Sequence, residues 1–371
     1  MEKQQKREER GKMRAWEKNI RKVVPYVPGE QPNLPNKIKL NTNENPYPPA
    51  PAVKKAQMDF ETEQLRLYPD PTSHVLTDTL ANYYRVNKNQ IFVGVGSDDV
   101  LAVAFMTFFN SNNPILFPDI TYSFYDVWAN LFHIPFERPK LDENFRIVKE
   151  DYYKENGGVV IANPNAPTSI YEDLNFIVDI LEHNQDVVVI VDEAYIDFGG
   201  RSAIELIEKY ENLLVVQTFS KSRSMAGIRI GYAIGNEKLI KAMNDVKYSY
   251  NSYTMNQFSL ALGVEAVKDE RYFKQTINRI IQTREWVKKE LNDLGFSFPD
   301  SKSNFLFVTH KNILAEDIFD ALRKENIFVR HFDGARVHNY LRITIGTEEE
   351  MKIVIGFLKK YVAQITNGSG K

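Results

Sequence analysis

A serine, a lysine and an arginine follow one apolar segment of the chain. The run Leu213–Phe219 leads directly into Ser220 and Lys221, and Arg229 comes eight residues after the lysine. A lysine amine can attack a carbonyl carbon, and serine and arginine side chains are suited to bind phosphate. These residues either keep a surface loop soluble or face an anionic ligand at the mouth of a sheet. The neighbouring segments must decide between the two interpretations.

Two further apolar segments end in polar residues of complementary chemistry. Asp192 ends the run Val187–Asp192, where a carboxylate needs a cation or a strong hydrogen-bond donor. Ser97 and Asp98 follow Ile91–Gly96 and open a helical pattern, whose first N–H groups suit a phosphate. Taken alone, Asp192 fits a structural salt bridge about equally well, and Ser97 and Asp98 are ordinary helix-capping residues.

These residues can meet only if the apolar segments are neighbouring strands. The segments are short and almost continuously apolar, and helical patterns such as 98–109 and 173–183 lie between them, which indicates a mostly parallel sheet with both faces covered. Ligands bind outside the carboxyl ends of the strands in such a sheet, where the polar residues are expected to converge. The expected strands are Ile91–Gly96, Pro114–Phe117, Val159–Asn163, Val187–Asp192, Leu213–Phe219 and Ile228–Gly235.

The strand ends together offer phosphate donors, a buried anion and a lysine. A phosphorylated aromatic aldehyde with a basic ring nitrogen needs this set of groups. Lys221 would form an imine with the aldehyde, Asp192 would keep the ring nitrogen protonated, and the helix N-terminus would hold the phosphate. Pyridoxal 5'-phosphate is that molecule, so the sequence predicts it as the cofactor.

The chain resembles the fold-type I pyridoxal-phosphate aminotransferases, and in particular the histidinol-phosphate aminotransferases. The resemblance runs from about Val24 to the last helix. It rests on the order and spacing of the motifs PYVPGEQ, LNTNENPYPP, LYPDP, VGVGSDDVL, NPNAPTS, VDEAYIDF, TFSKSRSMAGIRIGY and LRITIG.

The resemblance implies a role for each cofactor residue. Lys221 is expected to form the internal aldimine and to move the proton, while Asp192 pairs with the ring nitrogen and Tyr195 bonds to the ring hydroxyl. Tyr122 is expected to stack on the ring. Tyr68 would reach the phosphate from a second subunit, which implies a homodimer with shared active sites. The remaining cofactor contacts are expected from Ser97, Asp98, Asn165, Thr218, Ser220 and Arg229.

The resemblance also implies the substrates, a small-molecule amine donor and a 2-oxo acid. Arg342 would bind the carboxylate of glutamate or 2-oxoglutarate, Arg330 the phosphate of histidinol phosphate, and Asn43 is also expected at the substrate. Arg330 fits a solvent-facing position about equally well. The expected reaction is the reversible transamination of L-histidinol phosphate with 2-oxoglutarate, which gives imidazole-acetol phosphate and glutamate in histidine biosynthesis.

Two other interpretations concern the activity. An aromatic amino acid aminotransferase or a threonine-phosphate decarboxylase of the same fold would share the cofactor residues. A nucleotide-binding protein that uses GVGSDD as a phosphate loop is a rival of another class, but the third glycine of a dinucleotide motif is missing after Gly94 and Gly96.

The turn after the strand at Val159–Asn163 departs from the family pattern. Many relatives have Asn-Asn-Pro-Thr-Gly where this chain has Asn165-Ala166-Pro167-Thr168-Ser169. The asparagine that bonds the ring hydroxyl in the family is replaced by Ala166. Either Asn165 substitutes for it, or Tyr195 makes that hydrogen bond alone. Ser169 stands where the family has a turn glycine.

The composition sets the class of the protein. The chain has 371 residues, of which 43% are hydrophobic and 26% charged, and Lys+Arg 47 nearly balance Asp+Glu 49, so a soluble globular protein is expected, with no nucleic-acid or membrane partner. The absence of cysteine excludes disulfides and thiolate catalysis, and the six histidines show no ligand spacing, so no metal site is expected. No secretion signal or membrane span is evident, and a cytoplasmic protein is expected.

The fold class expected is α/β, with a large cofactor-binding domain like that of aspartate aminotransferase and a smaller α+β domain. The boundaries are placed at 1–46 for a Pro- and Asn-rich N-terminal arm, 47–255 for the large domain and 256–371 for the small C-terminal domain. The small domain is expected to contain one long helical region at 254–294, a strand in NFLFVT, a helix at 315–325, strands in IFVR and YLRITIG, and a final helix at 348–362.

Overall fold

A mixed sheet of seven strands forms the centre of the computed structural model, which describes residues 14–368. Its strand order is β2-β8-β7-β6-β5-β3-β4, in which β8 is antiparallel to both of its neighbours and the other pairs are parallel. The strands are β2 (Ile91–Gly94), β3 (Ile115–Leu116), β4 (Phe136–Glu137), β5 (Gly158–Ala162), β6 (Val189–Asp192), β7 (Leu213–Thr218) and β8 (Gly231–Gly235).

Helices cover this sheet on both faces. The α-helices that surround it are α3 (Pro51–Met58), α4 (His74–Tyr84), α5 (Ser97–Phe108), α6 (Phe124–Phe132), α7 (Leu174–His183), α8 (Glu237–Tyr250) and α9 (Gln257–Lys268). Short 3-10 helices lie at Thr62–Arg66 (η1), Lys88–Gln90 (η2), Lys149–Tyr152 (η3), Ile196–Phe198 (η4) and Ala203–Leu206 (η5). Because both faces are covered, every residue of β5, β6, β7 and β8 is buried, which explains their continuous apolar sequences.

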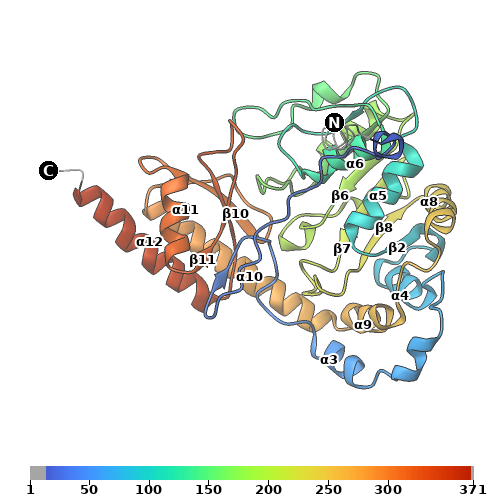
Figure 1. Ribbon diagram of the computed structural model, residues 1–371, viewed down its shortest axis with the longest axis horizontal. Helices are drawn as coiled ribbons and strands as arrows, with labels where there is room; N and C mark the ends of the chain where they lie inside the picture. Colours follow the sequence, from blue (N-terminus) through green and yellow to red (C-terminus); the bar gives the residue numbers. More distant parts are fainter. Residues whose placement is uncertain (1–13, 369–371) are drawn as a thin grey trace, which may run out of the picture.

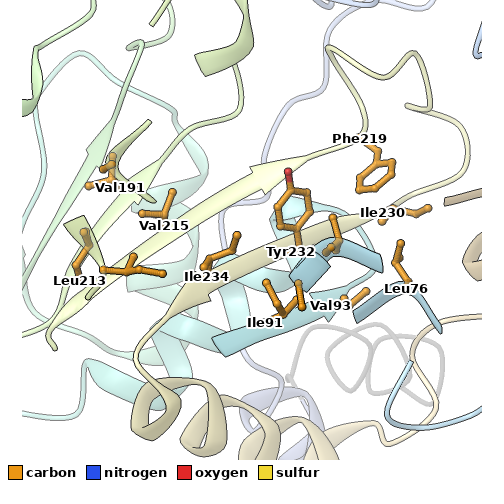
Figure 2. Packing of buried hydrophobic residues seen from close by; sticks show 14 of the residues in the cluster. Leu76, Ile91, Val93, Val191, Leu213, Val215, Phe219, Ile230, Tyr232 and Ile234 are labelled. Carbon is orange, nitrogen blue, oxygen red and sulfur yellow. The ribbon is translucent and has the colours of Figure 1, made fainter. Parts of the chain in front are cut away.

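Alternate residues of each strand belong to opposite layers of the core. Val191, Val215 and Ile234 are register partners on three adjacent strands and lie side by side in one apolar layer (Figure 2). The intervening residues Ile190 and Leu214 belong to the other layer, which includes helices α5 and α6. The two layers hold the strand ends at one edge of the sheet in fixed positions.

A second sheet lies in the C-terminal part of the chain, beside the first (Figure 1). Its four strands are antiparallel and have the order β12-β13-β10-β9. The elements of this part are α10 (Glu270–Asp293), β9 (Phe296–Ser297), β10 (Phe305–His310), α11 (Ala315–Lys324), β11 (Ile327–Phe328), β12 (Arg330–His331), β13 (Leu341–Thr344) and α12 (Glu348–Gly368).

The N-terminal arm connects the two parts of the molecule. After the single turn α2 (Ala15–Lys18), it runs from the region of α6 toward the C-terminal part, where β1 (Ile38–Lys39) pairs with β11 (Figure 1). On the way, the ring of Tyr26 stacks on that of Phe124 with centroids 4.2 Å apart. The extended arm is therefore anchored at both ends. Residues 1–13, which the sequence assigns to the arm, lie outside the described residues.

The fold class predicted from the sequence is confirmed, whereas two details differ. The expected helix at 254–294 is two helices, because the Asp269 side chain accepts a hydrogen bond from the Tyr272 N–H and caps the start of α10. The expected strand IFVR divides into β11 and β12, which pair with different strands. The division at 46 and 255 stays a prediction, although α9 packs on α3 and α4 beside the large sheet. None of the described helices combines the length and apolar character needed to cross a membrane.

Candidate active site

A cavity of about 510 Å³ opens at the carboxyl ends of β6 and β7. Its walls come from the large sheet, the N-terminal arm and the C-terminal sheet. Most residues that the sequence analysis assigned to the site line this one cavity. They are Asn43, Ser97, Asp98, Tyr122, Asp192, Tyr195, Thr218, Ser220, Lys221, Arg229, Arg330 and Arg342.

Asp192 supplies a buried carboxylate at the end of β6. Its Oδ2 atom accepts a hydrogen bond of 2.8 Å from the Tyr125 hydroxyl, and its Oδ1 atom accepts one of 3.3 Å from the Ala194 N–H. Burial raises the pKa of Asp192 to about 6, while the bond from Tyr125 acts in the opposite direction. The acid can therefore bind a proton or a protonated ring nitrogen near neutral pH.

Lys221 lies between the sheet and the arm. Its Nζ atom donates a hydrogen bond of 3.0 Å to the Thr42 carbonyl oxygen and lies 5.8 Å from the centroid of the Tyr195 ring. The Asn45 side chain donates to the Lys221 carbonyl oxygen at 3.1 Å, which fixes the backbone at this point. The amine thus faces the cavity from the end of β7, beside the tyrosine.

Tyr195 is held by residues far away in the sequence. The Asn43 side chain donates a hydrogen bond of 3.0 Å to the Tyr195 hydroxyl. The Tyr195 ring packs edge-to-face against the ring of Phe305 on β10, with centroids 5.0 Å apart. The arm and the C-terminal sheet together therefore fix the position of this hydroxyl.

The opposite end of the cavity is suited to an anion. The first turn of α5 begins at Ser97 and directs its backbone N–H groups outward. Arg229 donates to Ser220 Oγ at 3.1 Å and to Asp98 Oδ2 at 3.2 Å. Gly96 has a φ of +85°, and a Cβ atom there would lie 2.3 Å from Arg229 Nη2. The glycine therefore leaves room for the guanidinium beside the helix terminus.

Tyr122 forms a wall of the cavity beside this end. Its hydroxyl donates a hydrogen bond of 2.8 Å to Asp98 Oδ1. Burial and the nearby Asp98 carboxylate raise the pKa of Tyr122 well above the ordinary range, so the phenol stays protonated. The ring of Trp128 lies edge-on to the Tyr122 ring, with centroids 6.3 Å apart. These contacts hold an uncharged aromatic surface in place.

Two arginines enter the cavity from the C-terminal sheet. Arg330 and Arg342 are register partners on β12 and β13, and neither forms an ion pair with a described residue. Arg342 donates to the Asn41 carbonyl oxygen at 2.8 Å, while its buried Nε atom has no partner within residues 14–368. Burial and the nearby Arg330 lower the pKa of Arg342. The pair therefore forms a second place for an anionic group.

Comparison with known proteins identifies the family. Residues 35–358 match the model of a family described as aminotransferase class I and II. A histidinol-phosphate aminotransferase from Lactococcus lactis subsp. cremoris (strain MG1363) is 51% identical, with 94% of this chain and 98% of that protein covered. The chain belongs to the class I and II aminotransferase family. The resemblance seen in its motifs is thus confirmed.

Solved structures of other aminotransferases share the fold. The histidinol-phosphate aminotransferase from Clostridium acetobutylicum is 25% identical and superposes with a TM-score of 0.81, covering 88% of this chain and 99% of that chain. One from Sinorhizobium meliloti, solved in complex with pyridoxal-5'-phosphate, is 22% identical with a TM-score of 0.80 over 88% of this chain and 91% of that chain. At that identity, the second likeness shows the fold alone.

Asn165 and Tyr68 do not line the cavity in this aminotransferase. The Asn165 side chain bonds to Thr121 Oγ1 at 2.7 Å, to the Ile120 carbonyl oxygen at 3.0 Å and to Thr168 Oγ1 at 2.9 Å. Its amide thus holds the turn, and Ala166 lines the cavity instead. Tyr68 is 82% exposed, and its ring lies 4.8 Å from that of Tyr253.

The turn itself keeps the shape that a glycine would favour. Ser169 has a φ of +65°, in the left-handed region, and is completely buried. The serine therefore adopts a backbone conformation that glycine adopts more readily.

Several residues of the site were not predicted from the sequence. Tyr125 binds Asp192 from behind, while Thr42, Glu44, Tyr26 and Phe332 line the cavity. Glu44 pairs with Lys39; burial raises the pKa of Glu44, but hydrogen bonds from Lys39 and Thr42 outweigh this and lower it. Tyr125 could have been suspected because it lies three residues after Tyr122, which was assigned to the cofactor ring, but the others belong to segments without local signals.

Proposed function

We propose that this aminotransferase transfers the amino group of L-histidinol phosphate to 2-oxoglutarate with pyridoxal 5'-phosphate as cofactor. The reversible reaction yields imidazole-acetol phosphate and glutamate in histidine biosynthesis. The observation that carries the proposal is the single cavity in which Lys221, the buried Asp192 and the anion-binding end at Arg229 converge. Identity of 51% to a histidinol-phosphate aminotransferase over nearly the whole of both chains supports the choice of substrate.

The donor set of the cavity fits the proposed cofactor. Asp192 offers a buried carboxylate to a ring nitrogen, and Tyr195 offers a hydroxyl to the ring oxygen. The start of α5, with Ser220 and Arg229, offers N–H and O–H donors to a phosphate. When bound, the cofactor supplies an electron sink for the carbon next to the reacting amine.

The side chains of this protein then bind, orient and move protons. Lys221 Nζ, once released from the Thr42 carbonyl oxygen, would act as the general base that removes the proton from the substrate Cα, and its protonated form would then be the proton donor of the later step. Asp192 would direct its negative charge at the ring nitrogen. Tyr26 on the arm covers the cavity and limits access of water.

Arg342 and Arg330 would recognise the anionic groups of the two substrates. Arg342 has a buried Nε donor without a described partner, which suits the carboxylate of glutamate or 2-oxoglutarate. Arg330 lies opposite Arg342 on the neighbouring strand and would bind the phosphate of histidinol phosphate. Asn43, a residue of the arm that already orients Tyr195, lines the cavity and would contact the substrate.

We also propose a homodimer in which Tyr68 of one subunit reaches the phosphate bound by its partner. Tyr68 contacts Tyr253, and Gln257 Nε2 donates to the Tyr68 carbonyl oxygen at 3.4 Å, so the segment is held in place. A second copy would cover a surface rich in exposed apolar and aromatic side chains. These are Met58, Leu65, Leu67, Tyr68, Tyr248, Tyr250 and Tyr253.

A spectroscopic and kinetic experiment tests the proposed function. Protein loaded with pyridoxal 5'-phosphate is expected to show the visible absorbance of a lysine-bound cofactor and to transaminate histidinol phosphate. Lys221→Ala is expected to lose both, whereas Lys241→Ala, an exposed lysine of α8, is expected to keep both. Retention of absorbance and turnover by Lys221→Ala would refute the assignment of the lysine.

A substrate panel separates the alternatives. Histidinol phosphate, phenylalanine and threonine phosphate are offered in turn, and amino transfer to 2-oxoglutarate and release of CO₂ are both recorded. Preference for phenylalanine would favour an aromatic amino acid aminotransferase, and CO₂ release from threonine phosphate would favour a decarboxylase. Either result would overturn the proposed substrate while leaving the cofactor assignment intact.

A further inference from the structure

Tyr125 contacts the Asp192 carboxylate of the site but does not itself line the cavity. It belongs to α6 and is completely buried, and its hydroxyl donates a hydrogen bond of 2.8 Å to Asp192 Oδ2. Within residues 14–368, no other side chain donates a hydrogen bond to Asp192. The remaining donor is the Ala194 N–H at 3.3 Å, a long contact. Tyr125 is therefore the principal support of this buried charge.

The Tyr125 ring is fixed on several sides by other aromatic rings. Its centroid lies 5.7 Å from that of Phe117 and 5.7 Å from that of Tyr122, with interplanar angles of 69° and 87°, and 6.2 Å from that of Phe105 in a stacked arrangement. Because the packed ring has little room to shift, its hydroxyl restrains the position of Asp192 Oδ2.

We propose that Tyr125 is a positioning residue, whose hydroxyl holds Asp192 Oδ2 so that the carboxylate presents an ionised and fixed acceptor to the ring nitrogen of the cofactor. The inference rests on the proposed function, because it assigns the Asp192 carboxylate to the cofactor. The charged groups around Asp192 are consistent with an ionised carboxylate that Tyr125 helps to stabilise. The positive charge of Lys221 stabilises the ionised form of Asp192, and the hydrogen bond from Tyr125 stabilises it further. The negative charge of Asp98 destabilises the ionised form.

A second buried tyrosine shows that burial alone does not require such a bond. Tyr152 is 1% exposed, and its hydroxyl has no hydrogen-bond partner within the described part of the chain. The fold thus tolerates a buried tyrosine hydroxyl without a partner, whereas that of Tyr125 is directed at a residue of the site. Tyr152→Phe is therefore a matched control for Tyr125→Phe, since both remove one buried hydroxyl.

Three measurements on the full-length protein test the proposal. In Tyr125→Phe, the titration midpoint of the Asp192 carboxyl in the cofactor-free protein, followed by ¹³C NMR, is expected to rise above that of the wild type. The dissociation constant of pyridoxal 5'-phosphate is expected to increase about tenfold or more, the range for loss of one hydrogen bond to a charged group. The kcat value is expected to fall while KM changes little. Tyr152→Phe is expected to match the wild type in all three.

An Asp192→Asn background keeps the test decisive if Tyr125→Phe folds poorly. Asparagine removes the charge, so adding Tyr125→Phe to Asp192→Asn is expected to cause no further loss of cofactor affinity. An equal loss in both backgrounds would overturn the proposal, as would a Tyr125→Phe protein that matches Tyr152→Phe. Failure of the wild type itself to bind the cofactor would instead count against the proposed function.

Discussion

Glu193, the residue after Asp192, is expected to make the stability of the protein depend on pH near neutrality. Its carboxylate is buried on the other side of β6 from the cavity and accepts hydrogen bonds from Ser202 Oγ at 2.6 Å, the Ala203 N–H at 2.6 Å and Gln217 Nε2 at 2.8 Å. Burial nevertheless raises the pKa of Glu193 to about 7. The fold therefore favours the protonated acid relative to the unfolded chain.

The sign and size of the effect follow from linkage. The stability gained by holding this proton is fully present below the ordinary pKa of 4.5 and is lost as the pH rises through about 7. The shift of the Glu193 pKa between the unfolded and the folded protein corresponds to about 3 kcal/mol of stability. About 2.5 kcal/mol of this stability is lost between roughly pH 5 and pH 8.5.

The perturbation is Glu193→Gln, whose side chain does not titrate. Its NH2 group replaces one of the two carboxylate oxygens and therefore faces either the Ala203 N–H or the Gln217 Nε2 donor, so the variant is expected to be less stable than the wild type at pH 5. As the pH rises, the wild type is expected to lose about 2.5 kcal/mol relative to the variant. Asp192 and the other acids titrate in both proteins, so their contributions cancel in the difference.

Urea unfolding of cofactor-free protein, at fixed concentration and at intervals between roughly pH 5 and pH 8.5, measures this difference. Glu211→Gln removes a carboxylate that is 71% exposed and serves as the control, for which the difference from the wild type is expected to stay constant. A constant difference for Glu193→Gln as well would refute the reasoning about its burial.

Three other substitutions test the remaining parts of the site. Gly96→Ala places a Cβ atom against the Arg229 guanidinium, so affinity for pyridoxal 5'-phosphate in a fluorescence titration should fall by about tenfold or more; unchanged affinity would contradict the anion-site assignment. Arg342→Lys should raise KM for 2-oxoglutarate by roughly tenfold while the cofactor absorbance stays constant, because lysine cannot bind a carboxylate with two parallel bonds. Mixing inactive Lys221→Ala and Tyr68→Ala proteins should restore about a quarter of wild-type activity, since half of the pairs are mixed dimers with one intact site; no recovery after subunit exchange would argue against a shared site.

The ends of the strands could be predicted because each strand gives a clear pattern in the sequence. Each strand of the large sheet is buried on both faces, so it reads as an apolar run, and the polar residue after it lies at the edge of the sheet. Lys221 and Asp192 were placed in this way, and the cavity contains both.

Other contacts had no local signal, because they join segments far apart in the chain. Tyr125 and Asp192 are 67 residues apart, and Lys221 and Thr42 are 179 residues apart. Periodicity predicts which face of an element is buried, but not which element covers it. Asn165 shows a further limit, because its amide bonds to Thr121, Thr168 and the Ile120 carbonyl oxygen and does not line the cavity.

The charges in the cavity determine how a ligand with two anionic ends can lie. Among the carboxylates that line the cavity, Asp98 forms an ion pair with Arg229. Glu44 forms one with Lys39, which does not line the cavity. The end near the start of α5 therefore combines a partly neutralised arginine with helix N–H donors, whereas Arg330 and Arg342 have no described ion pair. The phosphate of the proposed cofactor, which accepts many hydrogen bonds, fits the first end, and the anionic groups of the substrates fit the second. The reacting carbon of a substrate is then expected between them, next to the Lys221 amine, which forms no ion pair with a carboxylate among residues 14–368.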